Sequence, residues 1–161
     1  MIHSKNDNEL MKQIFQTSKT VAMVGVSSTK KKENSSNIRR RPSIIVMKYL
    51  QEFGYKVIPV NPSAVGGKIN GEDVVAKLED IKISVDIVNI FRPSLETPAL
   101  AKDAIKIGTK VIWLQYGIQN KETEEISKSA NIFYVANKCI KQEYQRLFLK
   151  VSPVFPVLQS S

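Results

Sequence analysis

A glycine–serine turn, Gly25-Val26-Ser27-Ser28, ends a compact, β-branched run that begins at Thr20. Glycine lets a ligand approach the main chain, serine hydroxyls donate hydrogen bonds, and the start of a following helix attracts anions. Together these groups suit a diphosphate. The next glycine after Gly25 is Gly54, so the chain has neither a Gly-x-Gly-x-x-Gly nor a Walker A motif. An ordinary strand-to-helix turn therefore stays open as the alternative.

The second candidate position is Asn61, which with Pro62 ends another apolar run, Lys56 to Val60. Enzymes that use NAD typically carry Asp or Glu at this point to hold the ribose hydroxyls. A neutral amide instead tolerates a phosphorylated ribose, which a carboxylate would repel. This position therefore favours a ligand with a phosphate on its ribose.

Basic residues gather between these two positions. The stretch from Lys30 to Arg41 carries six Lys or Arg and one Glu, so it contributes 6 − 1 = +5 to the net charge of +9. That charge would attract a ligand with several phosphates. Arg41 and Ser43 are best placed, because Pro42 between them suits the first turn of a helix. A solvated loop remains the alternative for Lys30 to Lys32.

Three further candidates follow later apolar runs. Phe91-Arg92-Pro93 could flank an adenine or a pantetheine arm and supply a cation, or simply lead into a helix. Gln115-Tyr116-Gly117 could bring backbone close to a ligand through Gly117, or form an ordinary turn. Cys139 is either a thiol that meets the ligand or an inert, half-buried side chain.

Neither a catalytic constellation nor a metal centre is predicted. The single histidine, His3, lies in a polar N-terminal stretch, and the single cysteine excludes an intrachain disulfide and a Cys-based zinc site. Asp86 lies within a strand-like run, and no spacing pairs it with a second carboxylate for acid–base work. We therefore expect a binding protein without catalysis of its own.

Strand-like and helix-like patterns alternate along the chain and must position these candidates. Strands are predicted over 20–26, 56–60, 68–69, 85–90, 110–114 and 132–135, with Trp113 in the core. Helices are predicted over 9–17, 42–53, 73–80, 95–107, 121–130 and 141–148. In the second helix, the expected inward face comprises Ile45, Val46, Tyr49, Leu50 and Phe53.

This alternation predicts an α/β, Rossmann-like doubly wound, mainly parallel sheet of five to six strands, with helices on both faces. Ligands of such sheets bind beyond the carboxyl ends of the strands, at the switch point of the topology. The candidate residues Gly25, Asn61, Arg92 and Gly117 all stand at predicted carboxyl ends.

Length and composition indicate one globular domain. We expect it to span 1–161, with a leading helix over 1–19 and an irregular tail over 149–161. The chain is 42% apolar and 24% charged, which excludes a disordered chain. The longest apolar run is about six residues, whereas a membrane span needs about 20. No secretory signal is visible, so we expect a cytoplasmic protein without a membrane segment.

Together, these strand-end residues resemble the small stand-alone CoA-binding domain proteins (YccU-like), which are related to the CoA-binding domain of the succinyl-CoA synthetase α subunit. The resemblance runs from about Thr20 to Leu147. Its most specific part is Tyr55-Lys56-Val57-Ile58-Pro59-Val60-Asn61-Pro62 followed by Phe91-Arg92. Further carriers are Val24-Gly25-Val26-Ser27, Arg41-Pro42-Ser43, Trp113-Leu114-Gln115-Tyr116-Gly117 and Cys139-Ile140-Lys141.

The resemblance implies CoA or an acyl-CoA as the ligand. Gly25, Ser27 and Ser28 would meet its phosphates, with Arg41 and Ser43 closing over them. Asn61 and Pro62 would border the adenosine, Phe91 and Arg92 would flank the nucleotide, and Gly117 would meet the pantetheine arm.

The sequence also departs from the family pattern. The basic stretch before Arg41 is longer than usual, Asn137 replaces a common Asp, and Ile140 replaces a common Pro. The synthetase relies on a phosphohistidine in a further domain, and no histidine follows His3 here, so its ligase reaction is not expected.

Two other functions compete with CoA binding. An NADP-dependent oxidoreductase would use Asn61 and the basic stretch, but it lacks the glycine fingerprint. A nucleic-acid-binding protein would use Lys30–Lys32 and Arg39–Arg41, but no aromatic residues interleave with them. The sequence does not specify the acyl group or the oligomeric state.

Overall fold

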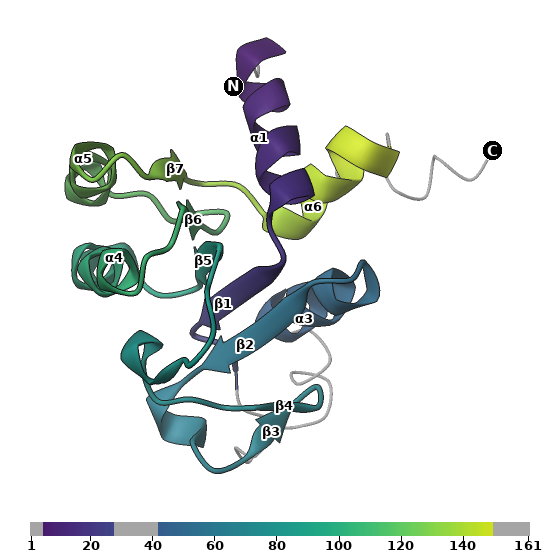
Figure 1. Ribbon diagram of the computed structural model, residues 1–161, viewed down its shortest axis with the longest axis vertical. Coiled ribbons are helices and arrows are strands. Elements are labelled where there is room, and N and C mark those ends of the chain that lie inside the picture. The colour runs from purple at the N-terminus through teal and green to yellow at the C-terminus, as the bar shows by residue number, and fades with distance from the viewer. Residues whose placement is uncertain (1–4, 28–41, 150–161) are drawn as a thin grey trace.

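The computed structural model describes residues 5–27 and 42–149, which form a five-stranded parallel sheet with helices on both faces (Figure 1). The strands lie in the order β2-β1-β5-β6-β7, and all neighbouring pairs are parallel. They are β1 Thr20–Val24, β2 Lys56–Val60, β5 Ile87–Ile90, β6 Val111–Leu114 and β7 Phe133–Val135. The predicted α/β, Rossmann-like architecture is confirmed.

The strand order fixes the switch point. From β1 the chain passes to β2 on one side, and from β2 it returns across β1 to β5. The carboxyl ends of β1 and β5 are therefore the place where a ligand is expected in such a sheet. Gly25 follows β1 directly, and Phe91 and Arg92 follow β5.

Helices cover the two faces of the sheet as separate groups (Figure 1). On one face lie α1 Lys5–Thr17, α3 Pro42–Glu52 and α6 Ile140–Tyr144, which enclose a core containing Trp113. On the other face lie α4 Thr97–Lys106 and α5 Lys121–Ser129, over a second core that contains Val88 and Ile112. Every residue of β1, β5 and β6 is buried, which is why these strands read as continuous apolar runs.

The predicted helix over 73–80 is wrong. Residues Glu72–Asp73 form β4, which pairs antiparallel with β3 Lys68–Ile69, and only Leu78–Asp80 forms a short 3-10 helix. Val75 makes a parallel bridge to Val60 at the end of β2. The predicted strand over 68–69 therefore belongs to a separate hairpin and not to the main sheet. Pairing with distant segments overrides the weak helical pattern of this region.

The predicted inward face of α3 is partly wrong. Val46 and Leu50 are buried, but Ile45 and Phe53 are each 41% exposed, and Ser43 and Met47 are buried instead. The last helix also differs, because α6 continues as a π-helix over Gln145–Leu149, so Leu149 is not part of an irregular tail. Residues 150–161 lie outside the described residues.

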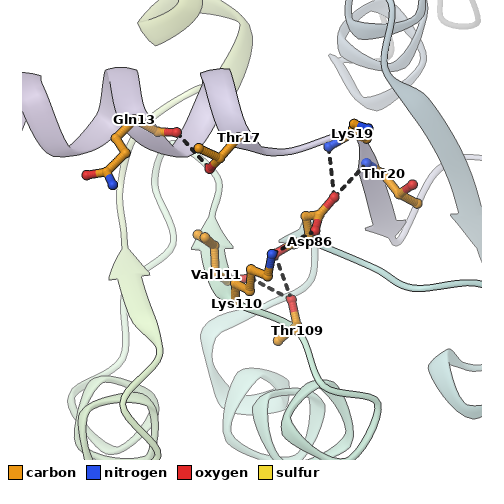
Figure 2. A network of polar contacts seen from close by, with 8 residues as sticks. All are labelled: Gln13, Thr17, Lys19, Thr20, Asp86, Thr109, Lys110 and Val111. Atoms are coloured by element: carbon orange, nitrogen blue, oxygen red, sulfur yellow. Dashed lines mark hydrogen bonds and ion pairs between the residues drawn. The ribbon is translucent and has the colours of Figure 1, made fainter.

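Asp86 joins three segments at the amino-terminal edge of the sheet, away from the switch point (Figure 2). Its Oδ2 accepts hydrogen bonds from the main-chain N–H groups of Lys19, at 2.8 Å, and Thr20, at 3.1 Å. Its own carbonyl accepts from the Thr109 hydroxyl and from the N–H groups of Lys110 and Val111. Asp86 is thus a structural residue that anchors the start of β1.

None of the described helices combines the length and apolar character needed to cross a membrane.

Candidate functional site

A cleft of about 440 Å³ opens at the carboxyl ends of β1 and β2, beside α4. Its apolar lining comes from Val24, Val60, Leu78 and Leu100. Its polar lining comes from Ser27, Asn61, Ser63, Lys77, Arg92, Glu96 and Asp103. Gly25, Pro62 and Ala76 complete the lining. The volume lies within the usual range of about 300–1,000 Å³ for small-molecule sites, and an apolar base with a few polar groups is their usual character.

Gly25 brings the ends of β1, β2 and β5 together. Its φ of +91° lies in the region that favours glycine, and its N–H donates to the Val60 carbonyl at 3.0 Å. A Cβ at this position would lie 2.9 Å from the Phe91 carbonyl oxygen and 2.8 Å from Arg92 Cδ. The glycine is therefore required by the close packing of the switch point itself.

Ser43 links the first turn to α3. Its Oγ accepts a hydrogen bond from the Ser27 N–H at 3.1 Å and lies 3.5 Å from Ser27 Oγ. Because Ser43 is only 3% exposed, it acts through Ser27 and does not face the cleft. The contact sets the direction of the turn after Gly25.

Asn61 fastens the same turn to the end of β2. Its Nδ2 donates to the Val26 carbonyl at 2.7 Å, and its Oδ1 accepts from the Ser63 N–H at 2.8 Å. A carboxylate could accept from Ser63 but could not donate to Val26. These two contacts are a structural reason for an amide at position 61. This reason is independent of the argument that an amide tolerates a phosphorylated ribose.

Arg92 and Glu96 form a bidentate ion pair at the mouth of the cleft. Arg92 Nε donates to Glu96 Oε1 at 2.9 Å, and Nη2 donates to Oε2 at 2.8 Å. These hydrogen bonds raise the pKa of Arg92 and lower the pKa of Glu96. The Nη1 group of Arg92 takes no part in the pair, so the guanidinium keeps donors for an anion.

Five predicted site residues line this cleft together, namely Gly25, Ser27, Asn61, Pro62 and Arg92. Three others support it from behind. Val26 is buried and offers its carbonyl to Asn61, Phe91 packs against the core with its carbonyl beside Gly25, and Ser43 holds Ser27. The predicted contacts Ser28 and Arg41 lie outside the described residues.

The remaining predicted residues gather at the ends of β6 and β7, outside the cleft. Gln115 is buried, and its Oε1 accepts from Asn89 Nδ2 at 3.3 Å and from the Ile140 N–H at 3.2 Å. The Gly117 N–H donates to Asn137 Oδ1 at 2.7 Å, which joins the two loops. Cys139 is half-buried against the core that contains Trp113. Gln115 is therefore a structural residue, and Gly117 and Cys139 form a second group.

Sequence reasoning missed four polar residues of the cleft, namely Ser63, Lys77, Glu96 and Asp103. Lys77 was not predicted as a site residue because its segment was predicted as a helix. In the structure, the bridge between Val75 and Val60 places this segment beside the end of β2. Glu96 had one visible signal, since it stands four residues after Arg92, a common spacing for an ion pair. Among the described residues, no group of three His, Cys, Asp or Glu side chains is arranged to hold a metal ion.

Comparisons with known proteins identify the family of this chain. A family model described as CoA binding domain matches residues 19–145. The uncharacterized protein YneT of Bacillus subtilis is 34% identical over 131 residues, covering 81% of this chain and 89% of that protein. An ADP-forming acetate–CoA ligase of Methanocaldococcus jannaschii is 26% identical over 149 residues, which span 86% of this chain but only 20% of the ligase.

The fold has a close counterpart among solved structures. A structure of the cell-free protein ID.343 from Thermus thermophilus superimposes with a TM-score of 0.79 at 34% identity, covering 88% of this chain and 98% of that one.

Proposed function

Because the chain belongs to the CoA binding domain family, we propose that it binds CoA or an acyl-CoA through the diphosphate and the phosphorylated ribose. In this proposal the protein has no catalysis of its own. The observation that carries it is the convergence of Gly25, Ser27, Asn61 and Arg92 on one cleft at the switch point.

The cleft fits the nucleotide half of CoA. Val24, Val60, Leu78 and Leu100 give an apolar base against which an adenine can pack. The turn at Gly25 and Ser27 offers main-chain and hydroxyl donors to the diphosphate, and the free donors of Arg92 supply positive charge. Ser28 and Arg41 are proposed to join them from the adjoining segment.

In this proposal the pantetheine arm leaves the cleft and runs toward the ends of β6 and β7. Gly117 and Cys139 stand on two loops that a hydrogen bond from Gly117 to Asn137 holds together. If the CoA thiol reaches Cys139, CoA disulfide should exchange with it, forming a mixed disulfide and releasing one reduced CoA. Intact mass spectrometry should then show one added CoA, and Cys139→Ser should prevent it. An unmodified wild-type protein would contradict this path for the arm.

The absence of catalysis is proposed from the chemistry of the cleft. Glu96, one of the two carboxylates that line the described part of the cleft, is held by Arg92 through two hydrogen bonds. The part of the acetate–CoA ligase that matches this chain is only 20% of the ligase, so we do not transfer the ligase reaction to this domain. A CoA-binding role needs only the donors and the apolar base described above.

Isothermal titration with CoA, dephospho-CoA and NADPH tests the proposal. We expect CoA to bind at least ~10-fold more tightly than NADPH, a difference of about 1.4 kcal/mol. NADPH binding with a change in nicotinamide fluorescence, and no CoA binding, would favour the oxidoreductase alternative. Preference for a DNA or RNA duplex, with a steep salt dependence, would favour the nucleic-acid alternative.

A further inference from the structure

The wall of the cleft beside β2 is built by a segment that the main chain fixes in place. Val75 forms a parallel bridge with Val60, its N–H donates to the Pro59 carbonyl at 3.1 Å, and its carbonyl accepts from the Asn61 N–H at 2.9 Å. Two residues later, Lys77 leaves this segment at the rim of the cleft. Main-chain pairing therefore holds Lys77 beside the turn from Asn61 to Ser63.

Lys77 places a positive charge at this rim, and no ion pair with the described residues balances it. It is exposed, and it lines the cleft. The other cation of the lining, Arg92, is held by Glu96 through two hydrogen bonds. Of the two cations lining the described part of the cleft, Lys77 is thus the one whose charge is not balanced by a carboxylate of the described residues.

The amide of Asn61 is largely engaged by the fold. Its carbonyl oxygen accepts from the Ser63 N–H and its nitrogen donates to the Val26 carbonyl, which leaves one N–H for a ligand and no positive charge. A charged group for a phosphate at this strand end therefore has to come from neighbouring residues, and Lys77 and Ser63 both line the cleft there.

The carboxylates of the lining point to the same place. Asp103 lies in α4, and Glu96, in the turn before it, is already paired with Arg92, so Asp103 would repel a phosphate on that wall. The wall at Lys77 and Ser63 brings an ammonium and a hydroxyl instead. A phosphate on the ribose would therefore make its most favourable electrostatic contacts and hydrogen bonds against this wall.

We propose that Lys77, assisted by the Ser63 hydroxyl, binds the phosphate on the adenosine ribose and sets a preference for CoA over dephospho-CoA. This assignment rests on the proposed CoA-binding function. It makes Lys77 a specificity-determining residue of the cleft.

The test compares Lys77→Met with Lys82→Met by isothermal titration against CoA and dephospho-CoA. Lys82 is also exposed and does not line the cleft, so its variant loses the same charge elsewhere. We expect Lys77→Met to weaken CoA binding ~10-fold and to leave dephospho-CoA binding within ~2-fold. Lys82→Met should leave both affinities within ~2-fold, and Lys77→Arg should retain the preference for CoA. Thermal unfolding checks that each variant is folded.

The possible failures are distinguishable. An unchanged ratio of the two affinities in Lys77→Met would overturn the assignment. The basic residues over 30–41 would then be the next candidates for binding the ribose phosphate. An equal loss for both ligands would also overturn it, because Lys77 would then act only through its general charge. Wild-type protein that binds both ligands equally refutes this inference and the part of the proposed function that concerns the ribose phosphate, but not CoA binding itself. Wild-type protein that binds neither ligand refutes the proposed function as a whole.

Discussion

At the scale of single residues, Gly25 meets two independent demands. Its positive φ favours glycine, and the space for a side chain is filled by the Phe91 carbonyl and the Arg92 side chain. The first demand is common to many turns, whereas the second arises only because β1 and β5 are neighbours. The same close approach brings Arg92 to the mouth of the cleft.

Gly25→Ala should destabilise the protein by about 2–4 kcal/mol, because backbone strain adds to a clash with a main-chain oxygen. Gly66→Ala is the matched control, since Gly66 has the same φ of +91° with nothing within 4 Å of a Cβ. It should cost only about 1 kcal/mol. Urea denaturation measures both, and equal costs would show that the packing at the switch point is unimportant.

Asn61 shows how one residue type can serve the fold and the ligand. Asn61→Asp removes the donor to the Val26 carbonyl and brings two oxygens together, which should cost about 1–3 kcal/mol. Asn131→Asp adds the same charge at an exposed position and should cost less than about 0.5 kcal/mol. If urea denaturation found Asn61→Asp as stable as wild type, the amide would not be structurally required.

At the scale of elements, α3 and the first turn act together through Ser43. Ser43→Ala should cost about 1 kcal/mol of stability and weaken CoA binding ~3-fold or more, because Ser27 loses the acceptor that directs its N–H. Ser127→Ala is the control, since Ser127 is equally buried and donates to the Thr123 carbonyl in α5. Titration should find CoA affinity unchanged in the control, and a loss in both variants would contradict a specific role for Ser43.

The elements differ in how well their sequences predict them. The strand over 56–60 and the helix over 121–130 follow from local patterns, and the structure confirms both as β2 and α5. The segment over 73–80 is too short for its own pattern to decide, and its pairing with β3 and Val60 is set by distant residues. Because Lys77 belongs to this segment, the error in the fold also hid a residue of the candidate site.

The expectation that ligands bind beyond the carboxyl ends of the strands predicts where the site lies better than it predicts which residues form the site. The candidates that directly follow described strands stand at the carboxyl edge, yet Gln115 is buried within the fold, and Gly117 and Cys139 lie outside the cleft. Distances along a sheet edge cannot be read from the sequence, because they depend on strand order. Position on the edge therefore predicts proximity only for neighbouring strands.

At the scale of the whole molecule, we expect the amino-terminal edge of the sheet to affect stability alone and the carboxyl-terminal edge to affect both stability and binding. Asp86 anchors the amino-terminal edge, whereas the cleft lies at the carboxyl-terminal edge. A substitution of Asp86 should therefore leave CoA binding unchanged, whereas substitutions of Gly25, Asn61 and Ser43 change the stability as well.

Asp86→Ala should cost about 2–3 kcal/mol, since two main-chain N–H groups lose a charged acceptor, while CoA affinity stays within ~2-fold. Lys110→Met should cost less than about 0.5 kcal/mol, because its ion pair with Asp86 spans 3.7 Å and the lysine is 70% exposed. Urea denaturation and titration on the same samples measure both properties. A large loss in Lys110→Met would show that the ion pair, and not the main-chain bonds, explains Asp86.

The most direct test of the whole account is a crystal structure of the protein with CoA. The account predicts the adenosine in the cleft between β2 and α4, the diphosphate at the turn of Gly25 and Ser27, and the ribose phosphate beside Lys77. CoA bound instead in the groove that Met11 and Tyr134 line between α1 and β7, with the cleft free of it, would contradict the account.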